Sequence, residues 1–151
     1  CGNYGCLETL VSQKAIIRSA KKLAEAKPDG IMARKFADCQ KDNIDCVFAA
    51  AKAGDPQILE MLAEKARYFG IALVNLINVI NPNLIVLGGI LGQGEEFFLP
   101  VIKKFVQEKA FSHLGDQVDI RVTEFGQKTG VIGASALALF TYFYDLEEIS
   151  G

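Results

Sequence analysis

The sequence predicts an α/β fold that is rich in helices and contains a short pair of parallel strands. One long stretch, 56–81, carries apolar residues at helical spacing. Two short apolar segments, 84–87 and 118–122, have the length of strands, and a helical pattern over 95–110 separates them. A strand, a helix and a second strand in this order are typical of a parallel pair joined by a right-handed crossover.

Three helices are expected before the first strand. The first runs from about Leu7 to Ala26, where apolar residues recur on one face, and Pro28-Asp29-Gly30 ends it. Residues 31–42 have mixed polarity and weak periodicity, which predicts irregular chain with at most one marginal helical turn. A short helix then fits from about Ile44 to Ala53.

The third helix has clear start and stop signals. It begins at Asp55-Pro56, because the carboxylate can accept hydrogen bonds from the first-turn amides and proline at the first position loses no needed donor. Asn81-Pro82 ends it. About 25 residues at 1.5 Å each span roughly 40 Å, so we expect this helix to be the central packing element.

The first strand should be buried on both faces, because Leu84 to Leu87 is a continuous apolar run that ends at Gly88-Gly89. A helix is expected from about Glu95 to Ala110, and Pro100 should kink or restart it near its first turn. A buried strand needs neighbours on both sides, so we expect further strands outside this chain.

The second strand and the last helix complete the order. Apolar Val118, Ile120 and Val122 alternate with polar residues, a period of two that predicts a half-exposed strand. The last helix is expected from about Thr129 to Glu147.

Composition limits the classes of protein that remain. The chain has 151 residues, 50% of them apolar, which suits one globular domain. Its 16 basic and 18 acidic residues nearly cancel, so composition indicates no basic face for binding the phosphates of a nucleic acid. The uncharged stretch 129–144 is shorter than the roughly 20 apolar residues of a membrane span. The first residues resemble no signal peptide, and four cysteines are too few for a disulfide scaffold, so a reducing compartment is expected.

Two thiols near the N-terminus, Cys1 and Cys6, are candidate metal ligands. Neighbouring glycines let this loop fold back so that both sulfurs reach one ion, but a tetrahedral zinc site needs four ligands. On spacing alone, ordinary thiols remain the alternative. We expect Cys39 and Cys46 to be small, buried or partly exposed thiols, and His113 to be a solvated loop residue.

The segment CGNYGCLE, residues 1–8, resembles the end of the signature of the ROK family of sugar kinases and sugar-responsive transcriptional repressors. That signature reads Cys-x-Cys-Gly-x-x-Gly-Cys-x-Glu, so Cys1 and Cys6 resemble its second and third cysteines. In the family these bind a structural zinc with the first cysteine and an upstream histidine. Both of those partners are absent here, so the resemblance implies a zinc site that is incomplete in this chain.

Five further motifs follow in the order that such proteins show: Ala51 to Asp55, 74–78 (VNLIN), Asn81-Pro82, 85–89 (IVLGG) and 130–134 (GVIGA). The resemblance therefore covers the whole chain. It implies the C-terminal part of an actin-like, ribonuclease H-like fold, with 1–151 as a single subdomain. The N-terminal lobe or DNA-binding domain would lie outside this chain.

The resemblance also implies site residues. Glu8 occupies the place of the glutamate that accepts hydrogen bonds from sugar hydroxyls in ROK kinases. The alternative is that Glu8 only stabilises the start of its helix, where its negative charge opposes the positive end of the helix dipole. Gly88 and Gly89 sit where actin-like ATPases let nucleotide approach the backbone, and Gly130 and Gly133 sit at the second such loop. The alternative is that both pairs are ordinary turns. Ile90, where the kinases have a third small residue, would crowd adenosine.

Two functions follow as expectations. The first is the sugar-binding and dimerisation fragment of a repressor that binds a sugar or sugar phosphate, contacts DNA only through an upstream domain, and forms a homodimer or homotetramer. The second is the C-terminal part of an ATP-dependent, glucokinase-like kinase. Of the two functions, only the kinase would need ATP and magnesium. The residues at positions 1–9 (CGNYGCLET) and the isoleucine at position 90 favour the repressor. A third alternative is a degenerate domain that only dimerises.

This chain by itself should not be a kinase. Phosphoryl transfer in the family needs a catalytic aspartate and the phosphate-binding loop of the N-terminal lobe, with an acidic residue for magnesium. No segment of this sequence resembles either feature. A cytoplasmic location without membrane contact is expected for both kinds of parent protein.

Overall fold

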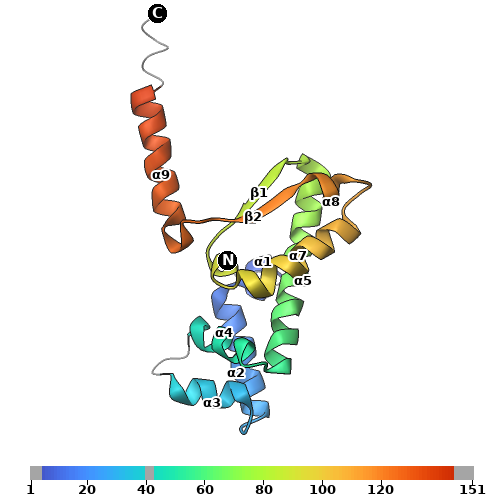
Figure 1. Cartoon of the computed structure of the whole chain (residues 1–151), viewed down its shortest axis with the longest axis vertical. Helices are drawn as coiled ribbons and strands as arrows, with labels where there is room; N and C mark the ends of the chain where they lie inside the picture. The colour runs from blue at the N-terminus through green and yellow to red at the C-terminus, as the bar shows by residue number, and fades with distance from the viewer. Residues whose placement is uncertain (1–4, 40–42, 145–151) are drawn as a thin grey trace, which may run out of the picture.

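The structure, a computed structural model, describes residues 5–39 and 43–144 (Figure 1). Its elements in chain order are α1 (Leu7–Val11), α2 (Gln13–Ala26), α3 (Ile31–Asp38), α4 (Ile44–Lys52), α5 (Pro56–Ile80), β1 (Leu84–Leu87), α6 (Ile90–Gln93), α7 (Glu95–Lys109), α8 (Leu114–Gln117), β2 (Asp119–Val122) and α9 (Thr129–Leu139). A 3₁₀ turn, Gly126–Lys128, precedes α9, and a π-helical turn, Phe140–Tyr144, continues it.

Helix α5 is the central packing element of the molecule, as its length predicted. Both oxygens of the Asp55 carboxylate are used at its start: Oδ1 accepts from the amides of Gln57 (3.0 Å) and Ile58 (3.2 Å), and Oδ2 accepts from the Met32 amide (3.0 Å). At its end Asn81 adopts a left-handed conformation, with φ 49°. The predicted start and stop signals are therefore confirmed.

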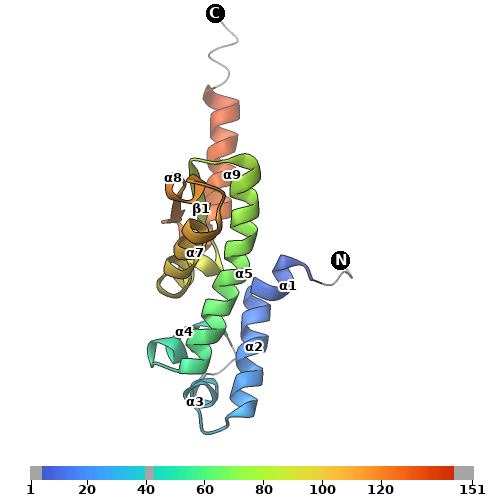
Figure 2. The same cartoon turned by 90° about the vertical axis from the view of Figure 1, so that its right-hand side faces the viewer.

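Two groups of elements pack at opposite ends of α5 (Figure 1, Figure 2). Helices α2, α3 and α4 surround its first half, whereas α7, α8 and the sheet lie beside its second half. The most extensive contact is between α5 and α7. One core runs through both groups, and its fully buried large side chains are Ile16, Val47, Ile58, Leu62, Ile77, Phe98, Ile102 and Val106.

The strands β1 and β2 pair in parallel, as predicted, with Leu84 opposite Asp119 and Leu87 opposite Val122. The expectation that β1 is buried on both faces is wrong for this chain, since Leu84 is 50% and Val86 56% exposed. Leu84 and Val86 alternate along the strand and share one face of this two-stranded sheet, and among the described residues no layer covers that face.

Other boundaries differ from the sequence prediction. The first helix is broken at Ser12, whose extended backbone ends α1 and whose hydroxyl caps α2 by accepting from the Ala15 amide at 3.3 Å. Residues 31–38 form α3 instead of irregular chain, because Met32 is buried and its amide is bound by Asp55. Helix α7 continues through Pro100, which lies in its interior. The single turns α6 and α8 were not predicted.

The expectation for the two middle cysteines is right about their burial and wrong about their chemical state. Cys39, at the end of α3, and Cys46, in the first turn of α4, form a disulfide, with their Cα atoms 6.6 Å apart. They meet because Asn43 caps α4, its Oδ1 accepting from the Cys46 amide at 3.0 Å, and α3 packs against α4.

Helix α9 projects away from the rest of the molecule (Figure 1). All of its residues are described and none is buried, although it is apolar on every side. The predicted helix is confirmed as far as the structure describes it; residues 145–147 lie outside the described part. In the described ranges, no helix has the length and apolar character that crossing a membrane requires.

Candidate functional site

A hollow of about 440 Å³ lies between α1 and the segment that follows β1. Its walls come from α1, from Phe69 of α5 and from residues 86–91, which include the glycine pair. The hollow therefore brings together Glu8 and Gly88-Gly89, two of the features that the sequence singled out, although about 80 residues of chain separate them.

The start of α1 is a tight turn. Gly5 has φ +77°, a conformation that side-chain-bearing residues rarely adopt. The Cys6 carbonyl accepts from both the amide (2.9 Å) and the hydroxyl (2.6 Å) of Thr9, and Arg18 of α2 donates to the Thr9 carbonyl at 3.2 Å. These bonds, with the contact of α1 against α5, hold the first turn at the rim of the hollow.

Glu8 lies in this first turn and is exposed. Its carboxylate is the acidic group that lines the hollow, among side chains that are mostly apolar. Such an arrangement can accept hydrogen bonds from two neighbouring hydroxyls of a ligand, while apolar walls cover the ligand's carbon surface. The same position also suits a helix-start carboxylate.

Gly88-Gly89 stands at the carboxyl end of β1. Gly89 has φ 63° and ψ −131°, a region essentially open only to glycine, and beyond its two chain neighbours no atom lies within 4 Å of where its Cβ would stand. Glycine at 89 is therefore required by the backbone and leaves open space beside it. Ile90 begins α6, lines the same hollow and packs against the core.

Gly130 and Gly133 do not line the hollow; they lie in the first turns of α9, and apart from their chain neighbours and the nearby helix backbone no atom lies within 4 Å of their Cβ positions. The loop before α9 is nevertheless close to Gly88, since the Thr123 methyl would stand 3.5 Å from a Cβ there. Thr123 and Thr129 hydroxyls are 3.2 Å apart. Both glycine segments thus follow the carboxyl ends of parallel strands, where open α/β sheets bind ligands. Their nucleotide role stays a prediction.

The candidate zinc ligands are described only in part. Cys1 lies outside the described residues, and Cys6 is the residue that precedes α1. Its partly exposed position beside the Gly5 turn fits a ligand in a loop that folds back on itself. Within 5–39 and 43–144, no three His, Cys, Asp or Glu side chains are placed to share a metal ion. His113 precedes α8 and is remote in sequence from this loop.

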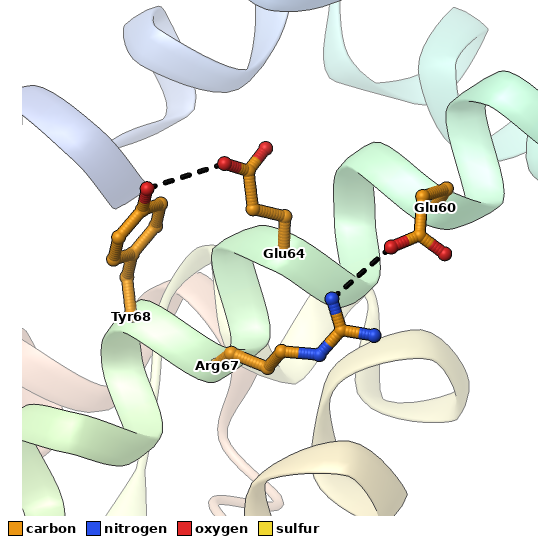
Figure 3. A network of polar contacts seen from close by, with 4 residues as sticks. All are labelled: Glu60, Glu64, Arg67 and Tyr68. Carbon is orange, nitrogen blue, oxygen red and sulfur yellow. Dashed lines mark hydrogen bonds and ion pairs between the residues drawn. The ribbon is translucent and has the colours of Figure 1, made fainter.

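A second, larger hollow of about 600 Å³ lies between α2 and α5. Two of its carboxylates are engaged along α5: Glu60 pairs with Arg67 (3.1 Å) and Glu64 accepts from the Tyr68 hydroxyl (3.2 Å), as Figure 3 shows. These contacts join exposed side chains along one helix, and they bring together no set of groups suited to catalysis. Sequence reasoning gave no signal for this hollow.

One pKa is clearly displaced among the described residues. On β2, a side-chain hydrogen bond from Arg121 to Asp119, with their charge attraction, raises the pKa of the Arg121 guanidinium. Neither residue lines the hollow at Glu8, so this pair does not tune the candidate site.

Comparison with known proteins is consistent with this geometry. A model of the ROK family matches residues 1–140. The chain is 32% identical over 137 residues to a glucokinase of Halalkalibacterium halodurans, covering 91% of this chain and 42% of that protein. It is 28% identical over 141 residues to a xylose repressor of Caldicellulosiruptor bescii, covering 92% of this chain and 35% of that protein.

The fold also matches a solved structure, a ROK glucokinase of Streptomyces griseus in complex with glucose and AMPPNP. The TM-score is 0.75 at 30% identity, over 91% of this chain and 45% of that one. The chain spans less than half the length of these relatives.

Proposed function

Because the chain belongs to the ROK family, we propose that it is the sugar-binding and dimerisation part of a sugar-responsive transcriptional repressor. The observation that carries the proposal is that Glu8 lines one hollow together with Gly88-Gly89. DNA contact would be made by a domain upstream of this chain. Relatives include a repressor and a glucokinase, so sugar is the ligand class that both kinds of relative share.

The chemistry of the hollow suits a sugar. The Glu8 carboxylate can accept hydrogen bonds from two adjacent hydroxyls, and a charged acceptor strengthens each bond. Phe69, Val86 and Leu87 supply apolar wall against which the C–H face of a sugar ring can pack. The carboxylate sets the orientation of the ligand, and the apolar wall excludes water behind it.

Ile90 favours a repressor over a kinase. It follows the glycine pair directly, lines the hollow and packs on the core, so its branched side chain takes space beside the backbone that a nucleotide would approach. A repressor responds to sugar binding alone and needs no room for adenosine.

The glucokinase-like kinase is the second candidate, and the geometry of Gly89 favours it. The open space beside this positive-φ glycine, at the carboxyl end of a parallel strand, is a place where phosphates can approach a backbone. ATP and magnesium would be needed only in this case, and the catalytic aspartate would come from outside this chain.

A structural zinc supports either function. In this proposal Cys1 and Cys6 supply two thiolates and the upstream part of the protein supplies two more ligands. The ion would hold the loop before α1, so that Glu8 stays at the rim of the hollow. Metal analysis of the full-length protein and of residues 1–151 tests this. One tightly held zinc in the short chain would show that the ligands are misplaced.

The full-length protein that carries this sequence decides between the two functions. Glucose, xylose and their phosphates are titrated against it by calorimetry, and ADP release is followed with each sugar plus ATP and magnesium. A repressor gives binding without ADP release. Sugar-dependent ADP release at enzymatic rates would instead establish the kinase, and absence of binding by every sugar would overturn both.

A further inference from the structure

Two cysteines stand where adjacent helices meet, outside the candidate site. Cys39 follows the last residue of α3, and Cys46 lies in the first turn of α4. Their Cα separation of 6.6 Å is within the range that a disulfide spans, and the structure joins their sulfurs. We propose that Cys39 and Cys46 form a reversible redox-modification site that fastens α3 to α4 in response to low-molecular-weight disulfides.

The fold positions both sulfurs before any bond forms. Asn43 caps α4 by accepting from the Cys46 amide (3.0 Å), and its Oδ1 also lies 3.1 Å from Cys46 Sγ, a distance that suits a thiol hydrogen bond in the reduced protein. At the other end of α3, the Met32 amide donates to buried Asp55 at 3.0 Å. Asp55 therefore holds the start of α3 in both redox states, and the disulfide adds a covalent link at its end when the protein is oxidised.

The two cysteines differ in access, which sets the order of reaction. Cys46 is 2% exposed, whereas Cys39 is partly exposed. The Cys39 thiolate attacks one sulfur of a disulfide RSSR, forming a Cys39–S–S–R bond and releasing RS⁻.

The second step closes the protein disulfide. The Cys46 thiolate attacks the Cys39 sulfur, forms the protein disulfide and expels a second RS⁻. The two protons lost by the protein thiols appear on two RSH molecules, so two thiols are oxidised and one RSSR is reduced. With excess thiol, RS⁻ attacks the accessible Cys39 sulfur and releases the Cys46 thiolate, and a second RS⁻ attacks the outer sulfur of the mixed disulfide and releases RSSR and the Cys39 thiolate.

The bond would affect more than the α3–α4 connection. Phe48 of α4 stacks on Phe97 of α7, with ring centroids 5.8 Å apart, and meets Phe98 edge-on at 6.2 Å. A Cβ on Gly94 would stand 2.6 Å from the Phe48 ring, so α4 packs directly on the turn between α6 and α7. Helix α6 begins beside the glycine pair and lines the hollow through Ile90 and Leu91, so α4 contacts the turn that follows one wall of the hollow.

The experiment equilibrates the full-length protein in glutathione buffers that run from fully reduced to fully oxidised. Free thiols are alkylated, and peptides are mapped by mass spectrometry. We expect a peptide linked through Cys39 and Cys46 whose fraction rises with oxidised glutathione and returns to zero in dithiothreitol. Amide hydrogens of α3 and α4 should exchange at least about tenfold more slowly in the oxidised protein than in the reduced protein, because a cross-link disfavours local opening.

Two variants make the result specific. Cys39→Ser removes the accessible sulfur at a partly exposed position and should abolish the oxidant-dependent protection. Ala37→Ser, an exposed substitution in the last turns of α3, should keep it. Full alkylation of both cysteines in the most oxidising buffer would overturn the proposal, as would a linked peptide that dithiothreitol does not reduce in the native protein, or unchanged oxidant dependence in Cys39→Ser.

Discussion

At the scale of single residues, the proposed binding of a sugar in the hollow depends on the carboxylate of Glu8. Replacing it by Gln keeps size and one acceptor but removes the charge. In the full-length protein we expect sugar affinity to fall by about 1.5–3 kcal/mol, roughly 10- to 150-fold in Kd, as for charge-assisted hydrogen bonds. Calorimetric titration of wild type and variant measures it.

The matched control is Glu25→Gln, which removes the same charge from an exposed position near the end of α2. It should leave sugar affinity unchanged. Equal affinities for wild type and Glu8→Gln, with the circular dichroism spectrum intact, would return Glu8 to the role of a residue that stabilises the first turn of α1.

Asp55 carries three hydrogen bonds on one carboxylate that is 6% exposed. Asp55→Ala removes the cap of α5 and leaves the buried Met32 amide without its acceptor. We expect unfolding free energy to fall by about 2–4 kcal/mol, more than the loss of a cap alone. Urea denaturation measures this, with Asp29→Ala, an exposed turn residue, as the control that should change stability by less than about 0.5 kcal/mol.

At the scale of elements, the packing of α7 on α5 depends on Gly70. A Cβ there would stand 2.9 Å from Cδ1 and 3.3 Å from Cβ of Phe105, too near the base of that side chain for it to move aside easily. Gly70→Ala should therefore destabilise by about 1–3 kcal/mol, although alanine is the better helix former by about 1 kcal/mol. A variant more stable than wild type in urea denaturation would contradict the described contact.

The elements also show what sequence can predict. The start and end of α5 and the parallel pair were predictable because capping, proline and hydrophobic period are local signals. The break at Ser12 and helix α3 were not, because Ser12 leaves the helix to cap α2 and α3 is held by Asp55 from 23 positions away. Tertiary contacts override weak local preference in both places.

The candidate site divides in the same way. Motif resemblance pointed to Glu8 and to Gly88-Gly89 separately, and no local pattern placed them around one hollow. The packing of α1 against α5 does that, with Phe69 of α5 lining the hollow beside residues 86–91. The pairing of Cys39 with Cys46 escaped prediction for the same reason, since it depends on how α3 packs against α4.

At the scale of the whole molecule, α9 is an apolar helix without a partner among the described residues. Val131, Leu137 and Leu139 are each more than half exposed, and such a surface normally lies against other protein. We expect residues 1–151 alone to bind a hydrophobic dye strongly, and the chain shortened to residues 1–128 to bind much less. Dye fluorescence of both chains measures this.

Shortening should not unfold the rest, because no α9 side chain is buried and the core lies around α5. The two chains should therefore show the same denaturation midpoint within error. A large loss of stability in the shorter chain would mean that α9 packs on the body of the molecule in solution.

The central claim is that the hollow between α1 and β1–α6 binds a sugar. Amide hydrogen exchange of the full-length protein, with and without a saturating sugar found by titration, tests it most directly. The account predicts slower exchange at residues 5–12 and 86–91 when sugar is bound. Protection confined to other segments, such as the α2–α5 hollow at residues 19–23 and 56–64, with 5–12 and 86–91 unchanged, would contradict it.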